Sequence, residues 1–247
     1  MKFRIGCSGY YYPQWKNKFY PQGLPPKNWL AYYSSVFNTV ELNGTFYRPP
    51  KLSDLKKYAQ VTPDDFTFSV KMNRQITHIQ RLKERQSILD FQDLIYEGLA
   101  DKLAHFLFQM PPSFHANEEN LERIHHHIPH QQHNVIELRH SSWWNDSLSE
   151  ILRKAKITFC NIDFPGLPSL PFINTTADFY LRLHGNPELF ITPYTSEQLY
   201  NYYHQLPKKT DVYTIYFNNT MYEAGYKNAM ELMQIVRERK SEEEKQK

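Results

Sequence analysis

Three short segments of the chain share one pattern, in which apolar and polar residues alternate. They are Val40-Glu41-Leu42-Asn43, Ile136-Glu137-Leu138-Arg139 and Leu181-Arg182-Leu183-His184. Because side chains alternate faces along a β-strand, the polar pair of each segment lies on one face and the apolar pair on the other. Carboxylates, guanidinium groups and an imidazole gathered on one face can transfer protons and bind anions. The pattern therefore predicts a polar functional site built from several strands.

The candidate catalytic residues are side chains that can exchange a proton or act as a nucleophile: Glu41, Lys71, Glu137, Asp163 and His184. Lys71 is suited to form a Schiff base or to contact a phosphate, and an ion pair with Glu41 is the alternative interpretation. Glu137 and Asp163 are suited to divide the acid and base roles between them.

The candidate substrate-binding residues are cationic, aromatic or hydrogen-bonding: Tyr10, Asn43, Tyr47, Gln109, Arg139, His140, Trp143, Arg182 and Asn218. The planar guanidinium groups of Arg139 and Arg182 match a carboxylate or phosphate, so we predict that they clamp an oxyanion, with Lys71 as a third cation. Aromatic side chains near strand ends can stack on a base or a sugar ring. A self-neutralising network of three carboxylates and three cations is the alternative.

Metal binding is not favoured by these residues. Glu41, Glu137, Asp163 and His184 are suitable ligand types for a divalent ion, but the three cations at the same level would repel it. The histidines between positions 125 and 133 are interrupted by Pro129, so we interpret them as solvated surface residues. We therefore predict no metal ligands, and no motif identifies a cofactor.

Eight short runs of β-branched and aromatic residues predict strands, with a mean spacing of about 30 residues, the length of one βα unit. They are Phe3–Gly6, Thr39–Asn43, Phe66–Lys71, His105–Gln109, Val135–Arg139, Thr158–Asp163, Tyr180–His184 and Tyr213–Asn218. Amphipathic patterns predict helices over Asn28–Phe37, Ser53–Gln60, Leu82–Leu99, Asn117–Ile128, Ser147–Ala155, Ser196–Gln205 and Ala224–Arg239.

This alternation predicts an α/β fold, a single (β/α)₈ TIM-like barrel over residues 1–236, with a charged tail at 237–247 that frays. The segment 165–176 is rich in proline and glycine, so we expect a loop in place of the helix after strand six. Active sites of such barrels lie at the carboxyl ends of the strands. We expect ten side chains to point inward there: Glu41, Asn43, Lys71, Gln109, Glu137, Arg139, Asp163, Arg182, His184 and Asn218.

The composition is that of a globular protein: 247 residues, 40% hydrophobic and 22% charged. No apolar run is long enough to span a membrane and the start has no signal-peptide core. Two cysteines are too few for a disulfide scaffold, so we expect a cytoplasmic protein. Residues 1–85 hold 14 Lys and Arg against 5 Asp and Glu, although the whole chain carries only +3. This asymmetry can mark an anion-facing surface.

Several motifs in order resemble the YecE-like family, a domain of unknown function (DUF72). They are GCSGYYYPQW (6–15), ELNGTFY (41–47), FSVK (68–71), ITH (76–78), QMPPSF (109–114), ELRHSSW (137–143), YLRLHG (180–185) and YFNN (216–219). The resemblance implies a TIM-like barrel related to sugar isomerases and barrel-type endonucleases, and it implies no particular reaction. Asn17 stands where glycine is usual and Cys7 where threonine is common, so the first loop departs from the family pattern.

Three functions are compatible with these residues. We favour an enzyme that acts on a small anionic, polyhydroxylated molecule, such as a sugar phosphate, at the carboxyl end of the barrel. Isomerase, lyase and hydrolase chemistry all remain open. A nucleic-acid-binding or phosphodiester-cleaving protein is the first alternative, based on the basic N-terminal third and the loop aromatics. A non-catalytic ligand-binding barrel is the second. The sequence leaves the oligomeric state open.

Overall fold

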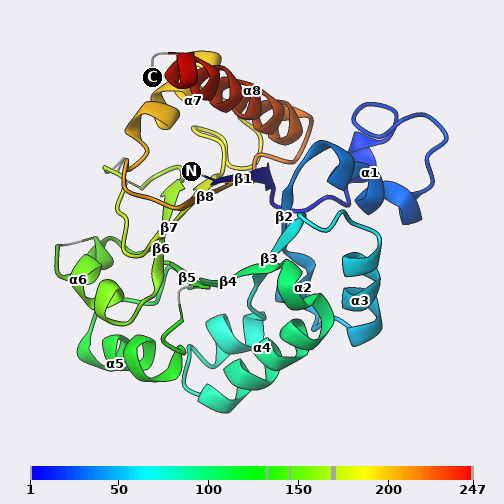
Figure 1. The fold of residues 1–247 in the computed structure, drawn as a ribbon. Helices are drawn as coiled ribbons and strands as arrows, with labels where there is room; N and C mark the ends of the chain where they lie inside the picture. The colour runs from blue at the N-terminus through cyan, green and yellow to red at the C-terminus, as the bar shows by residue number, and fades with distance from the viewer. Residues whose placement is uncertain (1, 132, 145, 168–170, 246–247) are drawn as a thin grey trace.

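The computed structural model describes residues 2–131, 133–144, 146–167 and 171–245. Eight parallel strands form one sheet in the order β1-β8-β7-β6-β5-β4-β3-β2, which curls into a nearly closed barrel (Figure 1). The strands are β1 Lys2–Cys7, β2 Thr39–Leu42, β3 Thr67–Lys71, β4 Leu103–Gln109, β5 Asn134–Glu137, β6 Thr158–Asp163, β7 Asp178–Leu183 and β8 Val212–Phe217. The predicted TIM-like barrel and its eight strands are confirmed.

Helices surround the ring of strands (Figure 1). They are α1 Trp29–Val36, α2 Gly44–Tyr47, α3 Leu52–Gln60, α4 Arg85–Leu99, α5 Glu118–His127, α6 Asp146–Lys154, α7 Ser196–Gln205 and α8 Ala224–Lys245. Between β6 and β7, the described residues 164–167 and 171–177 contain no helix, as expected from their prolines. None of the described helices combines the length and apolar character needed to cross a bilayer.

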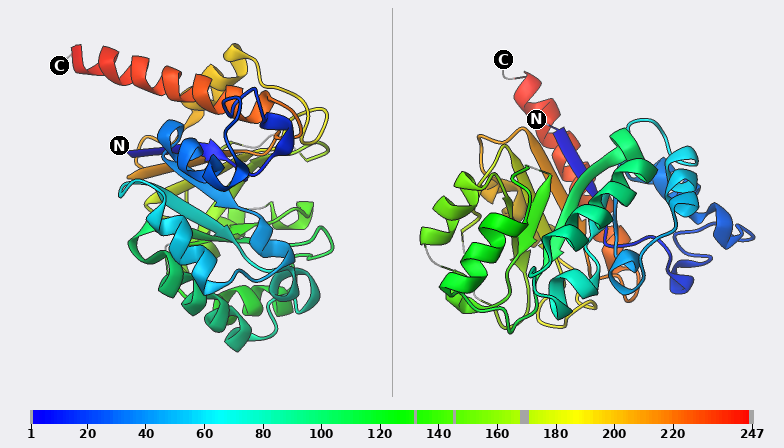
Figure 2. Two further views of the ribbon diagram at one scale, coloured as in Figure 1. Left: turned by 90° about the vertical axis from the view of Figure 1, so that its right-hand side faces the viewer. Right: turned by 90° about the horizontal axis from the view of Figure 1, so that it is seen from below.

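The C-terminal segment differs from the prediction. Helix α8 continues to Lys245, so residues 237–245 are helical and extend beyond the barrel (Figure 2). Arg239 forms an ion pair with Glu242, and its guanidinium lies 4.6 Å from the centre of the Tyr200 ring. Charge pairs spaced three residues apart stabilise an exposed helix, which a count of charged residues does not reveal.

The seam between β1 and β2 is closed by side chains. The Asn38 carboxamide donates to the Phe3 carbonyl oxygen at 2.8 Å and accepts from the Ile5 amide at 3.1 Å. The Tyr33 hydroxyl accepts from the Cys7 amide at 2.7 Å and donates to the carbonyl oxygen of Thr39 at 3.1 Å. Two side chains from α1 and the loop after it thus satisfy backbone groups that a strand ladder would otherwise pair.

Close approach at this seam requires glycine at one position. A Cβ atom on Gly6 would lie 2.1 Å from the Thr39 carbonyl oxygen, which no side chain can accommodate. This residue of β1 thus allows the strand to pack against β2.

Two hydrophobic clusters define the faces of the strands. The larger lies between the strands and the helices, and the smaller fills the barrel interior with Leu107, Val135, Cys160, Tyr180 and Tyr216. Because strand side chains alternate faces, the interior residues fix which positions of each strand point inward. On β7, for example, Tyr180 and Arg182 share the inward face and His184 continues it just beyond the strand.

Candidate active site

A buried ion-pair network spans the barrel at the carboxyl ends of β2, β5 and β7. One terminal nitrogen of Arg182 donates to Glu41 Oε1 at 2.8 Å, and the other donates to Glu137 Oε2 at 2.5 Å. All three side chains are at most 1% exposed. Arg182 of β7 therefore joins carboxylates from two other strands, β2 and β5, and is almost inaccessible to solvent.

Neighbouring groups complete the hydrogen bonds of both carboxylates. Glu41 accepts from the Ser8 hydroxyl at 2.8 Å and from the Tyr180 hydroxyl at 2.7 Å. Glu137 accepts from Arg139 Nε at 2.5 Å. Buried charges are tolerated when they are paired and hydrogen-bonded in this way.

The network fixes the charge state of its members. Burial raises the pKa of Glu137, but the positive charges of Arg139 and Arg182 outweigh it and hold that pKa well below its usual range. Burial acts in the opposite sense on Arg182, where Glu41 and Glu137 nevertheless raise the pKa well above its ordinary value. Glu137 and Arg182 are therefore both charged at neutral pH.

His184 lies beside the network as a neutral imidazole. Its Nδ1 is 2.8 Å from Asn218 Nδ2, and its Nε2 is 3.4 Å from a terminal nitrogen of Arg182. Complete burial, followed by the charge of Arg182, lowers the pKa of His184 well below its ordinary value. The ring therefore adds hydrogen-bonding capacity to the site and no charge.

Lys71 is a cation with no ion-pair partner among the described residues. Its ammonium lies 4.2 Å above the centre of the Phe46 ring, and the side chain is half-buried. Burial, with a further contribution from Arg182, lowers the pKa of Lys71 to about 8. The alternative interpretation, an ion pair with Glu41, is not what the structure shows, because Arg182 occupies that carboxylate.

Arg139 is the second cation that reaches the open end of the barrel. Only its Nε is engaged, with Glu137, and its guanidinium lies 4.6 Å from the centre of the Phe164 ring. Its two terminal nitrogens have no hydrogen bond or ion pair within the described ranges. They remain able to bind an anion.

Asp163 corrects the expectation that it points inward. On β6 the side chains of Cys160 and Ile162 belong to the interior cluster, so Asp163 lies on the opposite face. Its carboxylate accepts from the Tyr194 hydroxyl at 2.6 Å and from Asn186 Nδ2 at 3.0 Å. Of the six charged residues predicted for the mouth, all within the described part of the chain, three cations and two carboxylates therefore remain there, an excess of one positive charge.

A nearby histidine is subject to the same positive field. His78 lies in the short helical segment Gln75–Ile79 that follows β3, and burial followed by the charges of Lys71 and Arg139 lowers its pKa to about 4. An anion bound in this region would therefore be attracted by several basic groups.

The other predicted binding residues are distributed unevenly. Asn218 contacts His184, and the buried Gln109 follows the interior Leu107 on β4 but donates to the Met110 carbonyl oxygen at 2.7 Å. Tyr10 and Asn43 line a pocket beside the mouth.

Three aromatic candidates do not contact the charged network. Trp143 is 1% exposed and donates its indole N–H to the Phe114 carbonyl oxygen, so it is a packing residue. Tyr47 is 75% exposed, and His140 stacks on His115 with ring centres 3.8 Å apart. These three residues follow a strand end in the sequence, as the inward-pointing residues do, so their place in the sequence alone could not separate the two groups.

Several site residues were missed by the sequence interpretation. Ser8 and Tyr180 hold Glu41, while Phe46 and Phe164 lie against the cationic groups of Lys71 and Arg139. Tyr180 could have been found, because it lies two residues before Arg182 on the same face of β7. Within the described residues, no three His, Cys, Asp or Glu side chains are grouped so as to hold a metal ion.

Comparison with known proteins gives the family. A profile described as "Protein of unknown function DUF72" matches residues 4–247. UPF0759 protein YunF of Bacillus subtilis is 30% identical over 143 residues, covering 54% of this chain and 50% of that protein. UPF0759 protein YecE of Escherichia coli K12 is 27% identical over 136 residues, covering 53% and 48%. The chain thus spans about half the length of the curated relatives it matches.

Two solved structures share the fold. A DUF72 family protein from Thermotoga maritima superimposes with a TM-score of 0.84 at 28% identity, over 96% of this chain and 100% of that one. A DUF72 family protein from Enterococcus faecalis gives 0.77 at 17% identity, over 95% of each chain. These matches confirm the resemblance and the barrel, and their descriptions name no reaction.

Proposed function

Because the chain belongs to the DUF72 family, whose description assigns no reaction, we propose its function from the site itself. We propose an enzyme that acts on a small anionic, polyhydroxylated molecule at the carboxyl end of the barrel. Lys71 and Arg139 hold the anionic group, and Lys71 also transfers a proton to or from the substrate.

The observation that carries this proposal is the ammonium of Lys71, which has no ion-pair partner among the described residues, beside two carboxylates that arginines already engage. A ligand-free structural network would neutralise each cation with a carboxylate, yet Asp163 points away and both remaining carboxylates are engaged by arginines. An anion supplies the missing negative charge, and a charge-assisted hydrogen bond is the strongest contact available to it.

Arg182 has a positioning role in this proposal. Its two terminal nitrogens are bonded to Glu41 and Glu137, so it would have to break a buried ion pair to clamp a ligand. The oxyanion clamp expected from Arg139 and Arg182 is therefore proposed as Arg139 with Lys71. Arg182 keeps Glu137 in place, and Glu137 in turn holds the Nε side of Arg139.

The lowered pKa of Lys71 supports a role in proton transfer. With a pKa of about 8, a useful fraction of the side chain is the free amine near neutral pH. A free amine can accept a proton from a hydroxyl or an acidic carbon of the substrate, and the resulting ammonium remains beside the bound anion.

Ligand titration tests the proposal. Ribose 5-phosphate and related sugar phosphates are titrated into the wild type and into Lys71→Met and Arg139→Gln by calorimetry. Each substitution should weaken binding about ten- to a hundredfold, the range expected for a lost charge-assisted hydrogen bond. Lys154→Met and Arg153→Gln, on the exposed helix α6, are matched controls and should bind as the wild type does. If no sugar phosphate binds, or if both substitutions leave binding unchanged, the proposal is wrong.

A further inference from the structure

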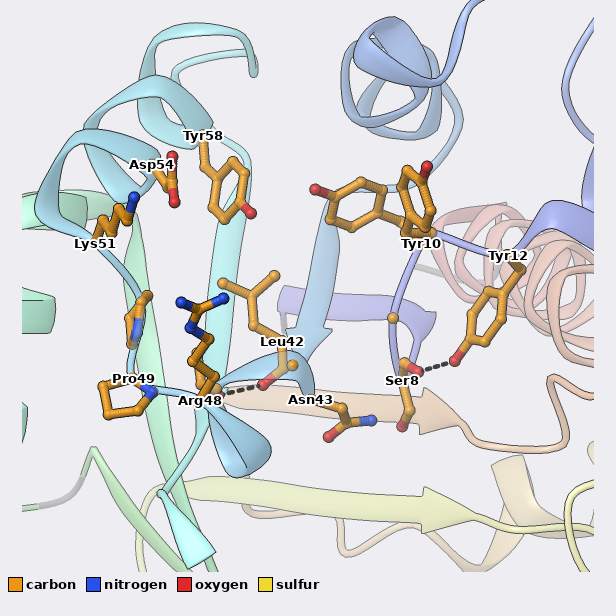
Figure 3. Close-up of a pocket in the computed structure, with 15 residues that line it drawn as sticks. Ser8, Tyr10, Tyr12, Leu42, Asn43, Arg48, Pro49, Lys51, Asp54 and Tyr58 are labelled. Atoms are coloured by element: carbon orange, nitrogen blue, oxygen red, sulfur yellow. Dashed lines mark hydrogen bonds between the residues drawn. The ribbon is translucent and has the colours of Figure 1, made fainter.

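A cavity of about 460 Å³ adjoins the charged mouth on the side of β1 and β2 (Figure 3). It lies between the loop after β1 and the segment that runs from the end of β2 into α3. Ser8 and Asn43 line it, and the Ser8 hydroxyl donates to Glu41, the carboxylate that also binds Arg182. The cavity and the charged network therefore share a wall.

Flat apolar surfaces dominate the walls of this cavity. Tyr10, from the loop after β1, meets Tyr58 of α3 edge to face, with ring centres 6.3 Å apart (Figure 3). Leu42 and Pro49 extend the apolar lining below them. Aromatic and proline rings present planes on which another planar ring can stack.

Next to the charged network most hydrogen-bonding groups of the cavity are already engaged, whereas the exposed charged side chains of Arg48, Lys51 and Asp54 line its outer part (Figure 3). The Tyr12 hydroxyl bonds to the Ser8 carbonyl oxygen and accepts from Thr220 at 2.9 Å, and the Ser8 hydroxyl is engaged by Glu41. The Asn43 carboxamide is different, because its buried Oδ1 has no hydrogen-bond partner in the described part of the chain. A planar ring with a single donor group needs only the one free acceptor that Asn43 offers in this inner part.

We infer that this cavity holds the planar heteroaromatic ring of the substrate, with the Asn43 carboxamide as its hydrogen-bonding partner. The inference rests on the proposed function, because it places the anionic group of the same molecule between Lys71 and Arg139. A molecule with an aromatic heterocycle, a polyhydroxylated middle part and a phosphate is a nucleoside phosphate. The geometry thus narrows the substrate class from sugar phosphates to nucleoside phosphates.

Three probes separate the two parts of the ligand: adenosine 5′-monophosphate, ribose 5-phosphate and adenosine. All are titrated into the wild type, Tyr58→Leu, Asn43→Ala, Arg139→Gln and Lys71→Met, with circular dichroism to confirm folding. Leucine keeps an apolar side chain at position 58 and removes the aromatic face. Tyr96→Leu, in α4, is the matched control for loss of a partly exposed tyrosine.

The inference predicts that adenosine 5′-monophosphate binds about tenfold or more tightly than ribose 5-phosphate, the gain expected from one stacked base. Tyr58→Leu and Asn43→Ala should remove most of this gain and leave ribose 5-phosphate binding unchanged. Arg139→Gln should weaken both phosphates and leave adenosine unchanged, and Tyr96→Leu should alter none of them.

The experiment distinguishes failure of the aromatic subsite from failure of the proposed anion site. If the two phosphates bind equally and Tyr58→Leu and Asn43→Ala change neither, the aromatic subsite is wrong while the proposed function stands. If adenosine binds and Tyr58→Leu abolishes it, but Arg139→Gln and Lys71→Met do not affect the phosphates, the subsite stands and the anion site fails. Absence of binding by all three probes overturns both.

Discussion

The Tyr194 hydroxyl donates to the Asp163 carboxylate across 2.6 Å, on the outer side of β6. This contact keeps one negative charge away from the barrel mouth, where the carboxylates of Glu41 and Glu137 lie with the cations of Lys71, Arg139 and Arg182. Anion binding by the mouth therefore depends on the direction in which one side chain of β6 points.

Asp163→Asn tests this charge balance. The substitution should leave sugar-phosphate affinity within about twofold of the wild type, because the carboxylate is not part of the mouth. The free energy of unfolding should fall by about 1 kcal/mol as the bonds from Tyr194 and Asn186 weaken. Titration calorimetry and urea unfolding measure the two quantities, and a large change in affinity would place Asp163 in the site after all.

Arg182→Met should act on folding more than on binding. It leaves the buried carboxylates of Glu41 and Glu137 without their shared cation, which costs about 3–5 kcal/mol in comparable buried pairs. Urea unfolding measures the loss. Because the single variant can fail to fold, Arg182→Met is also combined with Glu41→Gln and Glu137→Gln. Removal of all three charges should recover much of the stability, and an equally unstable triple variant would contradict the explanation.

Lys71 should make anion binding depend on pH. Its ammonium form binds the anion, and its pKa is about 8, so affinity for ribose 5-phosphate should fall as the pH rises from 7 to 9. The phosphate keeps its charge over this range. Lys71→Arg retains a permanent cation and should bind with no such fall. A wild type with the same affinity at pH 7 and pH 9 would contradict the lowered pKa.

His184 should destabilise the fold as the medium becomes acidic. Its pKa in the folded state lies well below the value of about 6.5 in the unfolded chain, so the unfolded state takes up the proton first. Stability is therefore present above pH 6.5 and decreases below it, by at most about 1.4 kcal/mol per pH unit for one group. Urea unfolding between pH 7 and pH 5 should give a shallower decrease for His184→Gln. Equal slopes would indicate that other histidines account for the effect.

Nucleic-acid binding stays a prediction with a simple test. If DNA is a partner, its affinity should fall steeply as salt rises, because bound cations are released from the phosphates. On the proposed function we expect weak binding of labelled single-stranded and duplex DNA by fluorescence anisotropy. Tight binding with a steep salt dependence would instead favour the nucleic-acid alternative.

The alternation of polar and apolar residues was a reliable guide on β2, β5 and β7, whereas the expectation that Asp163 on β6 points inward, which rested on its place at a strand end, was wrong. On those three strands the outward residues pack against helices, so the polar pair has to point inward. No helix follows β6 in the described residues, and the loop that replaces it presents backbone groups. The Asn161 carboxamide accepts from the Ile173 amide at 2.8 Å and donates to its carbonyl oxygen at 2.9 Å. The prolines predicted that this helix is missing. Because the loop presents backbone groups in place of an apolar helix face, the polar side chains of β6 point outward.

The sequence predicted which charged residues belong to the site better than it predicted which of them pair with one another. Sequence placed Glu41, Glu137 and Arg182 at the same end of the barrel, but the pairing of one arginine with two carboxylates depends on distances across the interior. Lys71 was left unpaired because Arg182 reached Glu41 instead. Such competition between cations is decided by side-chain length and register, which strand patterns do not encode.

The seam between β1 and β2, which side chains close, also allows local opening of the barrel to be followed by hydrogen exchange at backbone amides of β1. The amides of Ile5 and Cys7 are bonded to the side chains of Asn38 and Tyr33, so a rotamer change is enough to release them. Amides within a backbone ladder require displacement of a strand, and their hydrogen exchange is correspondingly slower. The loop that carries Tyr10 begins directly after this seam. A ligand that contacts both Tyr10 and Tyr58 would therefore restrict opening of the seam. Hydrogen exchange at the amides of Ile5 and Cys7 would then be slower.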